Sequence, residues 1–347
     1  MSPAASPIDW ERAEQIAIRI AARRPSGDFA LDGEPHEAPA DIEDRIEAVT
    51  RLRSADGTAR VQLIDRAAWI RANVASFRTL LTPVMQQWQH AAGSTPFAGG
   101  FAGAQVGAVL GWMSTRVLGQ YDLLVGSDAA DDAVYLVGPN LASLEQRFGF
   151  DPYEFRTWVL VHELTHRAQF TGVPWMRAHF TGLLEQGLEA ADPSPGALAE
   201  GLRAALRERR DAGQQVRDGG VATLLASPEQ KAVMARIGGL MSLLEGHGDV
   251  TMTRAAGSLV PHAERFERVL RERRRAASPL NRLLMRLVGI EAKLEQYAAG
   301  RRFIAAIEAT RGERAVDRCW AGPDELPTLA EIRAPQEWLA RTAPANG

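Results

Sequence analysis

The chain has 347 residues, of which 46% are hydrophobic and 24% are charged. This balance is typical of a globular protein and excludes a disordered chain, a collagen-like chain or a disulfide-rich scaffold. The formal net charge of −3 gives no support to a general nucleic-acid-binding protein, which would usually be basic. At roughly 150 residues per domain, the length suggests about two domains or one large one. We expect an N-terminal helical region over residues 1–95 and a second domain with a C-terminal strap over residues 96–347, which could also form one continuous domain.

The first elements along the chain are predicted to be helices. Residues 6–9 are typical of a helix start and residues 25–27 of a helix stop. Residues 25–40 are rich in proline, glycine and acidic side chains and are predicted to form a loop. Residues 60–93 carry apolar side chains at a spacing of three and four and are predicted to be largely helical, with a kink or interruption at Pro83.

The stretch from Phe97 to Met113 carries no charge, but five of its seventeen residues are glycines. Four of these glycines recur every fourth residue, at positions 99, 103, 107 and 111. On a helix they would line one face and let a neighbouring backbone approach closely. We therefore expect a buried packing helix here and no membrane span.

A small amount of β-structure is expected next. The segments Tyr121–Val125 and Ala133–Val137 are apolar and are separated by turn-forming residues, which predicts a hairpin. Beyond Pro139 the chain is predicted to be nearly all helical to about residue 311, and the proline-containing tail to be an extended strap with a short helical turn. The predicted fold class is mainly α with a small β-hairpin or sheet.

The cysteine content and the N-terminus bear on the cellular location. Cys319 is the single cysteine, so an intrachain disulfide and a thiolate metal cluster are both excluded. The N-terminal segment has acidic residues among its apolar ones and lacks the pattern of a secretory signal. We expect a protein of the reducing cytoplasm.

Residues 162–166 read His-Glu-Leu-Thr-His. Residues four apart on a helix share a face, so His162 and His166 can offer two imidazoles to one Zn²⁺ ion. Glu163 lies beside them and is the candidate general base for a metal-activated water. The helical context is supported by a capping signal at residues 151–154 and by helix-ending residues at Gly172 and Pro174.

A third metal ligand is predicted on a later helix, which opens at residues 227–230. Glu245 falls on the edge of the apolar stripe of that helix, where a carboxylate is costly unless it is paired or bound to a metal. Asp249 follows four residues later on the same face. This Glu-x-x-x-Asp spacing resembles that of gluzincins, where the glutamate binds the metal and the aspartate orients a ligand histidine.

Other residues compete for roles at this site. His247 lies two positions from Glu245, on another face of the helix, and could contact substrate or stabilise an oxyanion. His179 could close the site. Tyr121 and Tyr297 could donate a hydrogen bond to a developing oxyanion. For each of these four, a packing or surface role is the alternative.

Several segments resemble the actinobacterial zincin-like hydrolases that are often named zinc-dependent metalloproteases. The resemblance is strongest to the branch associated with biosynthesis of the deazaflavin coenzyme. The segments that carry it are residues 117–122, 158–170, 173–175, 244–247, 293–297 and 326–328, with Trp338. The resemblance implies a mainly helical zincin-like domain with His162, Glu163 and His166 at the metal, and Glu245 as the third ligand by position.

The first interpretation is a zinc-dependent hydrolase, with a peptide or amide substrate. The strand at residues 133–137 could hold an extended peptide by strand addition. The alternative is a non-peptidase, either an amidase acting on a small coenzyme precursor or a metal-bearing scaffold. No nucleic-acid partner is expected, and the sequence predicts no oligomeric state.

Overall fold

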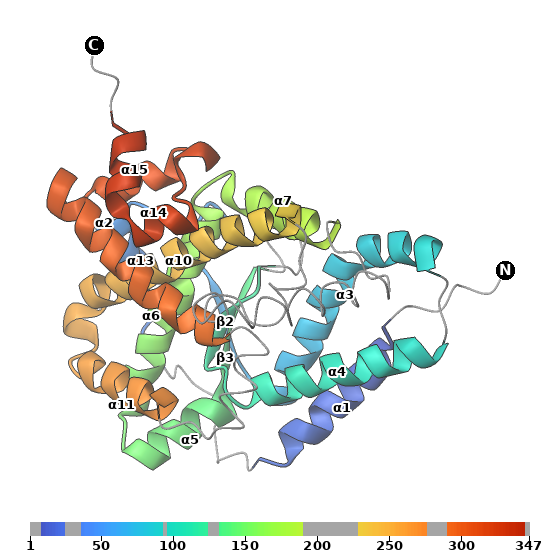
Figure 1. Ribbon diagram of the computed structural model, residues 1–347. Helices are drawn as coiled ribbons and strands as arrows, with labels where there is room; N and C mark the ends of the chain where they lie inside the picture. Colours follow the sequence, from blue (N-terminus) through green and yellow to red (C-terminus); the bar gives the residue numbers. More distant parts are fainter. Residues whose placement is uncertain are drawn as a thin grey trace. The chain divides into compact units, whose positions relative to one another are not determined.

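The computed structural model describes residues 8–24, 36–92, 96–123, 132–189, 228–275 and 290–343. These residues form helices and three short strands (Figure 1). The α-helices are α1 (Trp10–Ala22), α2 (Pro39–Thr50), α3 (Arg66–Ala92), α4 (Pro96–Ser114), α5 (Gly138–Phe148), α6 (Pro152–Thr171), α7 (Met176–Glu189), α10 (Pro228–Ala256), α11 (Ala263–Arg275), α13 (Ile290–Arg311), α14 (Leu329–Arg333) and α15 (Pro335–Arg341). The strands are β1 (Arg60–Ile64), β2 (Gly119–Tyr121) and β3 (Ala133–Val137), and the 3₁₀ turns are η2 (Gly257–Leu259), η3 (Ala315–Trp320) and η4 (Pro323–Glu325). The fold is mainly helical with a small sheet, as the sequence predicts.

The chain divides into two compact units. The first comprises residues 1–172 and 254–268, and the second comprises residues 173–253 and 269–347. Each unit therefore contains segments that are distant in the sequence. The boundary predicted near residue 95 stays a prediction.

In the first unit, α1, α3 and α4 pack together (Figure 1). A Cβ atom on Gly107 would lie 2.4 Å from the backbone oxygen of Ala13, and one on Gly111 would lie 2.8 Å from that of Ala17. These distances are far below van der Waals contact, so only glycine allows α4 to approach the alanine face of α1 this closely. The glycine repeat is a packing device of a core helix, as predicted.

The three strands form one sheet in the order β1-β3-β2. β2 pairs with β3 in the antiparallel sense, as the predicted hairpin requires, with Gln120 opposite Tyr135. β1 pairs with β3 in the parallel sense. The predicted helix over residues 60–93 is therefore wrong at its beginning: residues 60–64 are a strand, and the helix starts at Arg66.

The strand β3 is the middle strand of this sheet, with β1 on one side and β2 on the other. The prediction that residues 133–137 receive an extended peptide by strand addition is therefore wrong, because both edges of β3 are already paired. β2 is also shorter than predicted and ends at Tyr121. Residues 124–131, which include the last two residues of the predicted strand and most of its turn, lie outside the described ranges.

Helix α6 crosses the first unit and packs against α2, α5, β2 and β3. Its start is fixed by Asp151, whose side chain accepts a hydrogen bond from the backbone N–H of Glu154 at 2.9 Å, and by Pro152 in the first turn. At its end, the N–H of Gly172 bonds to the carbonyl of Ala168. Both ends agree with the prediction.

The second unit is built around α10 and α13. A Cβ atom on Gly300 would lie 1.8 Å from the backbone oxygen of Ser242, so the two helices are in backbone contact at their crossing. Leu243 of α10, Phe303 and Ile307 of α13, and Trp338 of α15 share one buried core. The tail is more helical than the predicted strap, because Thr328 forms a capping box with Glu331 that opens α14, and Pro335 opens α15.

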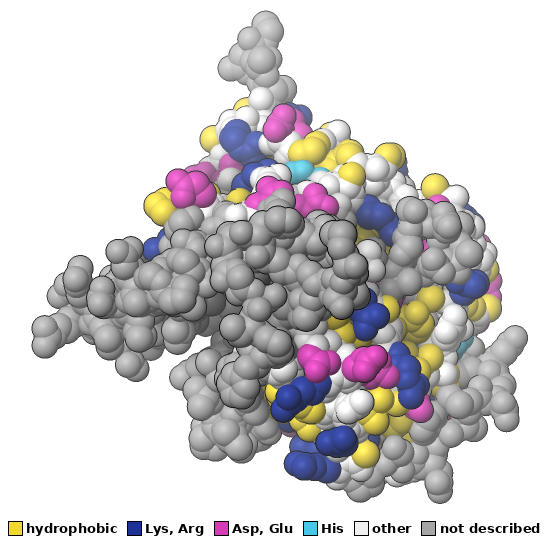
Figure 2. All heavy atoms as spheres, turned by 90° about the vertical axis from the view of Figure 1, so that its right-hand side faces the viewer, with side chains coloured by type: hydrophobic (Ala, Val, Ile, Leu, Met, Phe, Trp, Pro, Cys, Tyr) yellow, Lys and Arg dark blue, Asp and Glu magenta, His cyan; other side chains and the backbone are white. Residues whose placement is uncertain are grey.

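Within the described ranges, no helix is both long and apolar enough to span a membrane. The face drawn in Figure 2 shows basic and acidic side chains interspersed among apolar ones. This mixture agrees with the small net charge of the whole sequence.

Candidate metal centre

His162 and His166 lie one turn apart on α6, and both are partly buried. Their Nε2 atoms are 3.1 Å apart, and their rings meet edge to face with centroids 4.5 Å apart. Two imidazole nitrogens that bind one zinc ion tetrahedrally at about 2.0–2.1 Å lie about 3.3 Å from each other. The separation of the two imidazoles therefore suits the binding of one metal ion by both.

Glu163 is held against the end of the sheet. Its side chain is buried, and its Oε2 atom accepts a hydrogen bond from the backbone N–H of Tyr121 at 3.1 Å. A Cβ atom on Gly119 would lie 2.6 Å from Cγ of Glu163 and 2.9 Å from Cγ1 of Val159. Glycine at position 119 thus makes room for the Glu163 side chain, and β2 fixes where its carboxylate lies.

Gln169 supports one of the histidines. It is fully buried on α6, and its Oε1 atom lies 2.9 Å from Nδ1 of His166. The sequence places Gln169 on the buried stripe of the helix but gives it no role at the metal. The spacing of three residues after His166 is the signal that could have found it, because residues three apart are neighbours on a helix.

Arg167 is a second residue that sequence reasoning does not single out. It is 1% exposed, and its guanidinium binds Asp132 and Glu43 and donates to the backbone oxygen of Gly57 at 2.9 Å. Burial raises the pKa of Glu43, and the positive charge of Arg167 opposes that rise. This buried network joins the C-terminal part of α6 to α2 and to Asp132, the residue that precedes β3.

Glu245 lies on α10 and is 2% exposed. The next residue, Gly246, sits at the crossing with α13: a Cβ atom there would lie 2.4 Å from the backbone of Gly300. Close backbone packing on both sides of this crossing leaves α10 little freedom to rotate about its axis. The direction of the Glu245 side chain is therefore fixed within the second unit.

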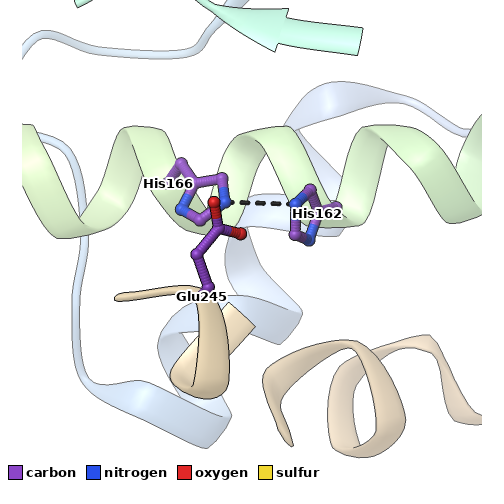
Figure 3. A group of neighbouring side chains, drawn as sticks. All are labelled: His162, His166 and Glu245. Atoms are coloured by element: carbon purple, nitrogen blue, oxygen red, sulfur yellow. Dashed lines mark hydrogen bonds between the residues drawn. The ribbon is translucent and has the colours of Figure 1, made fainter. Parts of the chain in front are cut away.

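One group of described residues could hold a metal ion: His162, His166 and Glu245, each offering one ligand atom, with all three atoms within 4.8 Å of one another (Figure 3). Figure 3 shows the carboxylate of Glu245 directed at the two imidazole rings. Two imidazoles and one carboxylate are a donor set that Zn²⁺ favours in catalytic sites. The residues therefore fit the predicted ion.

The residues near Glu245 have different surroundings. His247 is 3% exposed, and its ring meets that of Trp320 edge to face with centroids 5.1 Å apart. This contact makes His247 a residue of the interior of the second unit. Asp249 is partly buried one turn after Glu245, and its role in orienting a ligand histidine stays a prediction.

The remaining candidates are placed as follows. His179 packs edge to face on Trp175, with centroids 5.7 Å apart, and burial lowers its pKa, as does the charge of Arg236. The ring of Tyr121 is buried and stacks on Phe170, and its backbone N–H donates to Glu163. The hydrogen bond expected from its hydroxyl to an oxyanion stays a prediction. The side chain of Tyr297 lies outside the described part of the chain.

The pattern His-Glu-x-x-His on one helix, as on α6, is typical of the zincin class of metalloproteins. The sequence profile of the zincin-like metallopeptidase family matches residues 8–339. This chain therefore belongs to that family, whose members are classed as metal-dependent hydrolases.

A solved structure agrees with this placement. The chain is similar to a protein from Chloroflexus aurantiacus whose crystal structure is described as that of "a putative hydrolase with a novel fold". The two share 31% sequence identity over 98% of this chain and 100% of the other, with a TM-score of 0.70. No curated protein matches the sequence.

Proposed function

We propose that the protein is a zinc-dependent hydrolase that cleaves amide bonds, with peptides as its substrate class. The observation that carries this proposal is the group formed by His162, His166 and Glu245, with ligand atoms within 4.8 Å of one another. Membership of a metallopeptidase family supports the same reaction class. The proposal names His162 and His166 as ligands from α6, and Glu245 as the ligand from α10.

Zinc bound by these residues would polarise the substrate carbonyl and lower the pKa of a water molecule. Glu163 accepts the proton of the attacking water as a new bond forms between the water oxygen and the carbonyl carbon. As the carbon–nitrogen bond breaks, Glu163 passes that proton to the leaving amine. The backbone N–H of Tyr121, 3.1 Å from Oε2, holds the carboxylate in a fixed place during these transfers.

The first experiment measures zinc and hydrolysis in the same preparations. Wild type is expected to carry about one zinc ion per chain and His162→Ala much less, because one of three protein ligands is lost. Glu163→Gln keeps the shape of the side chain and is expected to keep zinc. It should lower the rate of cleavage of an unstructured polypeptide, followed by mass spectrometry, by roughly 10²–10⁴-fold.

The outcomes separate the proposal from its alternatives. Equal zinc content in wild type and His162→Ala would contradict the proposed metal site. Equal cleavage rates for wild type and Glu163→Gln would show that Glu163 is not the general base. Zinc in both proteins with cleavage of small amides alone would favour an amidase, and zinc without any cleavage would favour a metal-bearing scaffold. The association with deazaflavin coenzyme biosynthesis stays a prediction from the sequence.

A further inference from the structure

Gln169 makes a contact that no reading of the metal-binding motif alone would assign. The residue is fully buried on α6, one turn after His166, and its Oε1 atom is 2.9 Å from Nδ1 of His166. Burying a side-chain amide is costly unless it is hydrogen-bonded. Its position on the buried face, within bonding distance of the imidazole, therefore points to a role at that ring.

The chemistry of this contact determines which ring nitrogen of His166 carries the hydrogen. An amide oxygen only accepts hydrogen bonds, so Nδ1 of His166 must carry the hydrogen for the contact to be a bond. A neutral imidazole with its hydrogen on Nδ1 has its lone pair on Nε2. Nε2 of His166 is the atom that lies 3.1 Å from Nε2 of His162. With the opposite tautomer, Nε2 would carry a hydrogen and could not bind a metal ion.

We propose that Gln169 is a positioning residue that selects the metal-binding tautomer of His166 and fixes the orientation of its ring. This inference rests on the proposed function, because it takes His166 as a metal ligand. Gln169 would orient the imidazole of His166. The sequence analysis predicts the same kind of role, orienting a ligand histidine, for Asp249. The difference is charge: a neutral amide orients the imidazole without adding a negative charge beside the metal.

The experiment compares zinc dissociation constants, measured by competition with a chelator of known affinity. Gln169→Leu removes the acceptor at similar size and is expected to weaken zinc binding by roughly 10–100-fold, as losses of outer-shell partners usually do. Gln169→Glu keeps an acceptor of equal reach and should bind zinc at least as tightly as wild type.

Thr165→Val is the matched control for burial. Thr165 is fully buried on the same helix, and its hydroxyl donates to the backbone oxygen of Val161 at 2.7 Å. Its substitution removes a buried polar group from α6 without touching a histidine, so zinc affinity should stay within a few-fold of wild type. Equal loss of affinity in Thr165→Val and Gln169→Leu would overturn the inference, because the effect would then follow the stability of α6.

A second measurement gives its deciding result on the wild-type protein, so it does not require a variant to fold. Nitrogen-15 NMR of the histidine rings in zinc-free wild type should show the hydrogen of His166 on Nδ1, and in Gln169→Leu this preference should weaken. A hydrogen on Nε2 in wild type would overturn the inference. If wild type binds no zinc through His166, the proposed function fails. The NMR measurement still tests whether Gln169 determines which ring nitrogen of His166 carries the hydrogen.

Discussion

At the scale of single residues, the site depends on which of two neighbours points to the histidines. Glu245 and His247 are both buried on α10. A helix turns about 100° per residue, so side chains two positions apart diverge by about 200°. Glu245 shares the group of ligand atoms, whereas the ring of His247 packs on Trp320. Spacing predicts that the two side chains lie on different faces of α10, and the surroundings of each support Glu245 as the proposed third ligand.

Substitution of these two residues should therefore have opposite effects on zinc. Glu245→Ala is expected to lose most bound zinc in elemental analysis after dialysis, because one of three protein ligands is removed. His247→Ala should keep about one zinc per chain, although it should lower stability, since it leaves a cavity beside Trp320. Loss of zinc in His247→Ala alone, with zinc kept in Glu245→Ala, would contradict the assignment of the third ligand.

At the scale of elements, the positions of helices are set by glycines at close crossings. Gly107 brings α4 onto α1, and Gly246 brings α10 onto α13. Gly119 leaves room on β2 for the side chain of Glu163. In each case a missing side chain on one element determines how near another element lies. Gly246 is the neighbour of Glu245 in the chain, and Gly119 contacts Glu163, so two of these glycines lie beside residues that the proposed chemistry uses.

The same substitution should have opposite signs at two glycines. Gly107→Ala places a methyl group 2.4 Å from the backbone of Ala13 and should destabilise the protein by about 1–3 kcal/mol, the usual cost of overpacking. Gly182, on α7, has no atom within 4 Å of the added carbon, so Gly182→Ala should stabilise by about 0.5–1 kcal/mol through helix propensity. Urea unfolding of both variants tests this, and a stabilising Gly107→Ala would contradict the close crossing.

At the scale of the whole molecule, zinc should act as a stabilising ligand. The proposed ligands come from α6 and α10, which are distant in the sequence, so the unfolded chain does not present them together. An ion that binds only the folded chain stabilises it by about 2.7 kcal/mol at a free concentration 100 times the dissociation constant.

Thermal unfolding with and without zinc measures this linkage. Wild type and Thr165→Val should each melt several degrees higher with zinc than after chelation, because both keep the proposed ligands. His162→Ala should show little or no shift. A zinc-dependent shift of the same size in His162→Ala would mean that zinc binds elsewhere on the protein.

The sequence by itself determined the limits of α6 and the helix face that His162 and His166 share. The proline and capping aspartate at its start, the glycine at its end and the spacing of the two histidines are all local features, and the helix has the predicted limits. The four-residue spacing of the glycines on α4 likewise predicts their packing role, because positions four apart share a helix face. Local patterns suffice where the structure is decided within a few turns of one helix.

The tertiary structure decided what depends on distant partners. Residues 60–64 form a strand because β3 pairs with them in parallel, and no local signal reveals a partner about seventy residues away. Gly119 makes room for the side chain of Glu163, which lies far from it in the sequence and reaches it only in the folded chain. A short segment can carry the donor atoms of a metal site, but only packing fixes their directions, their tautomers and the distances between them.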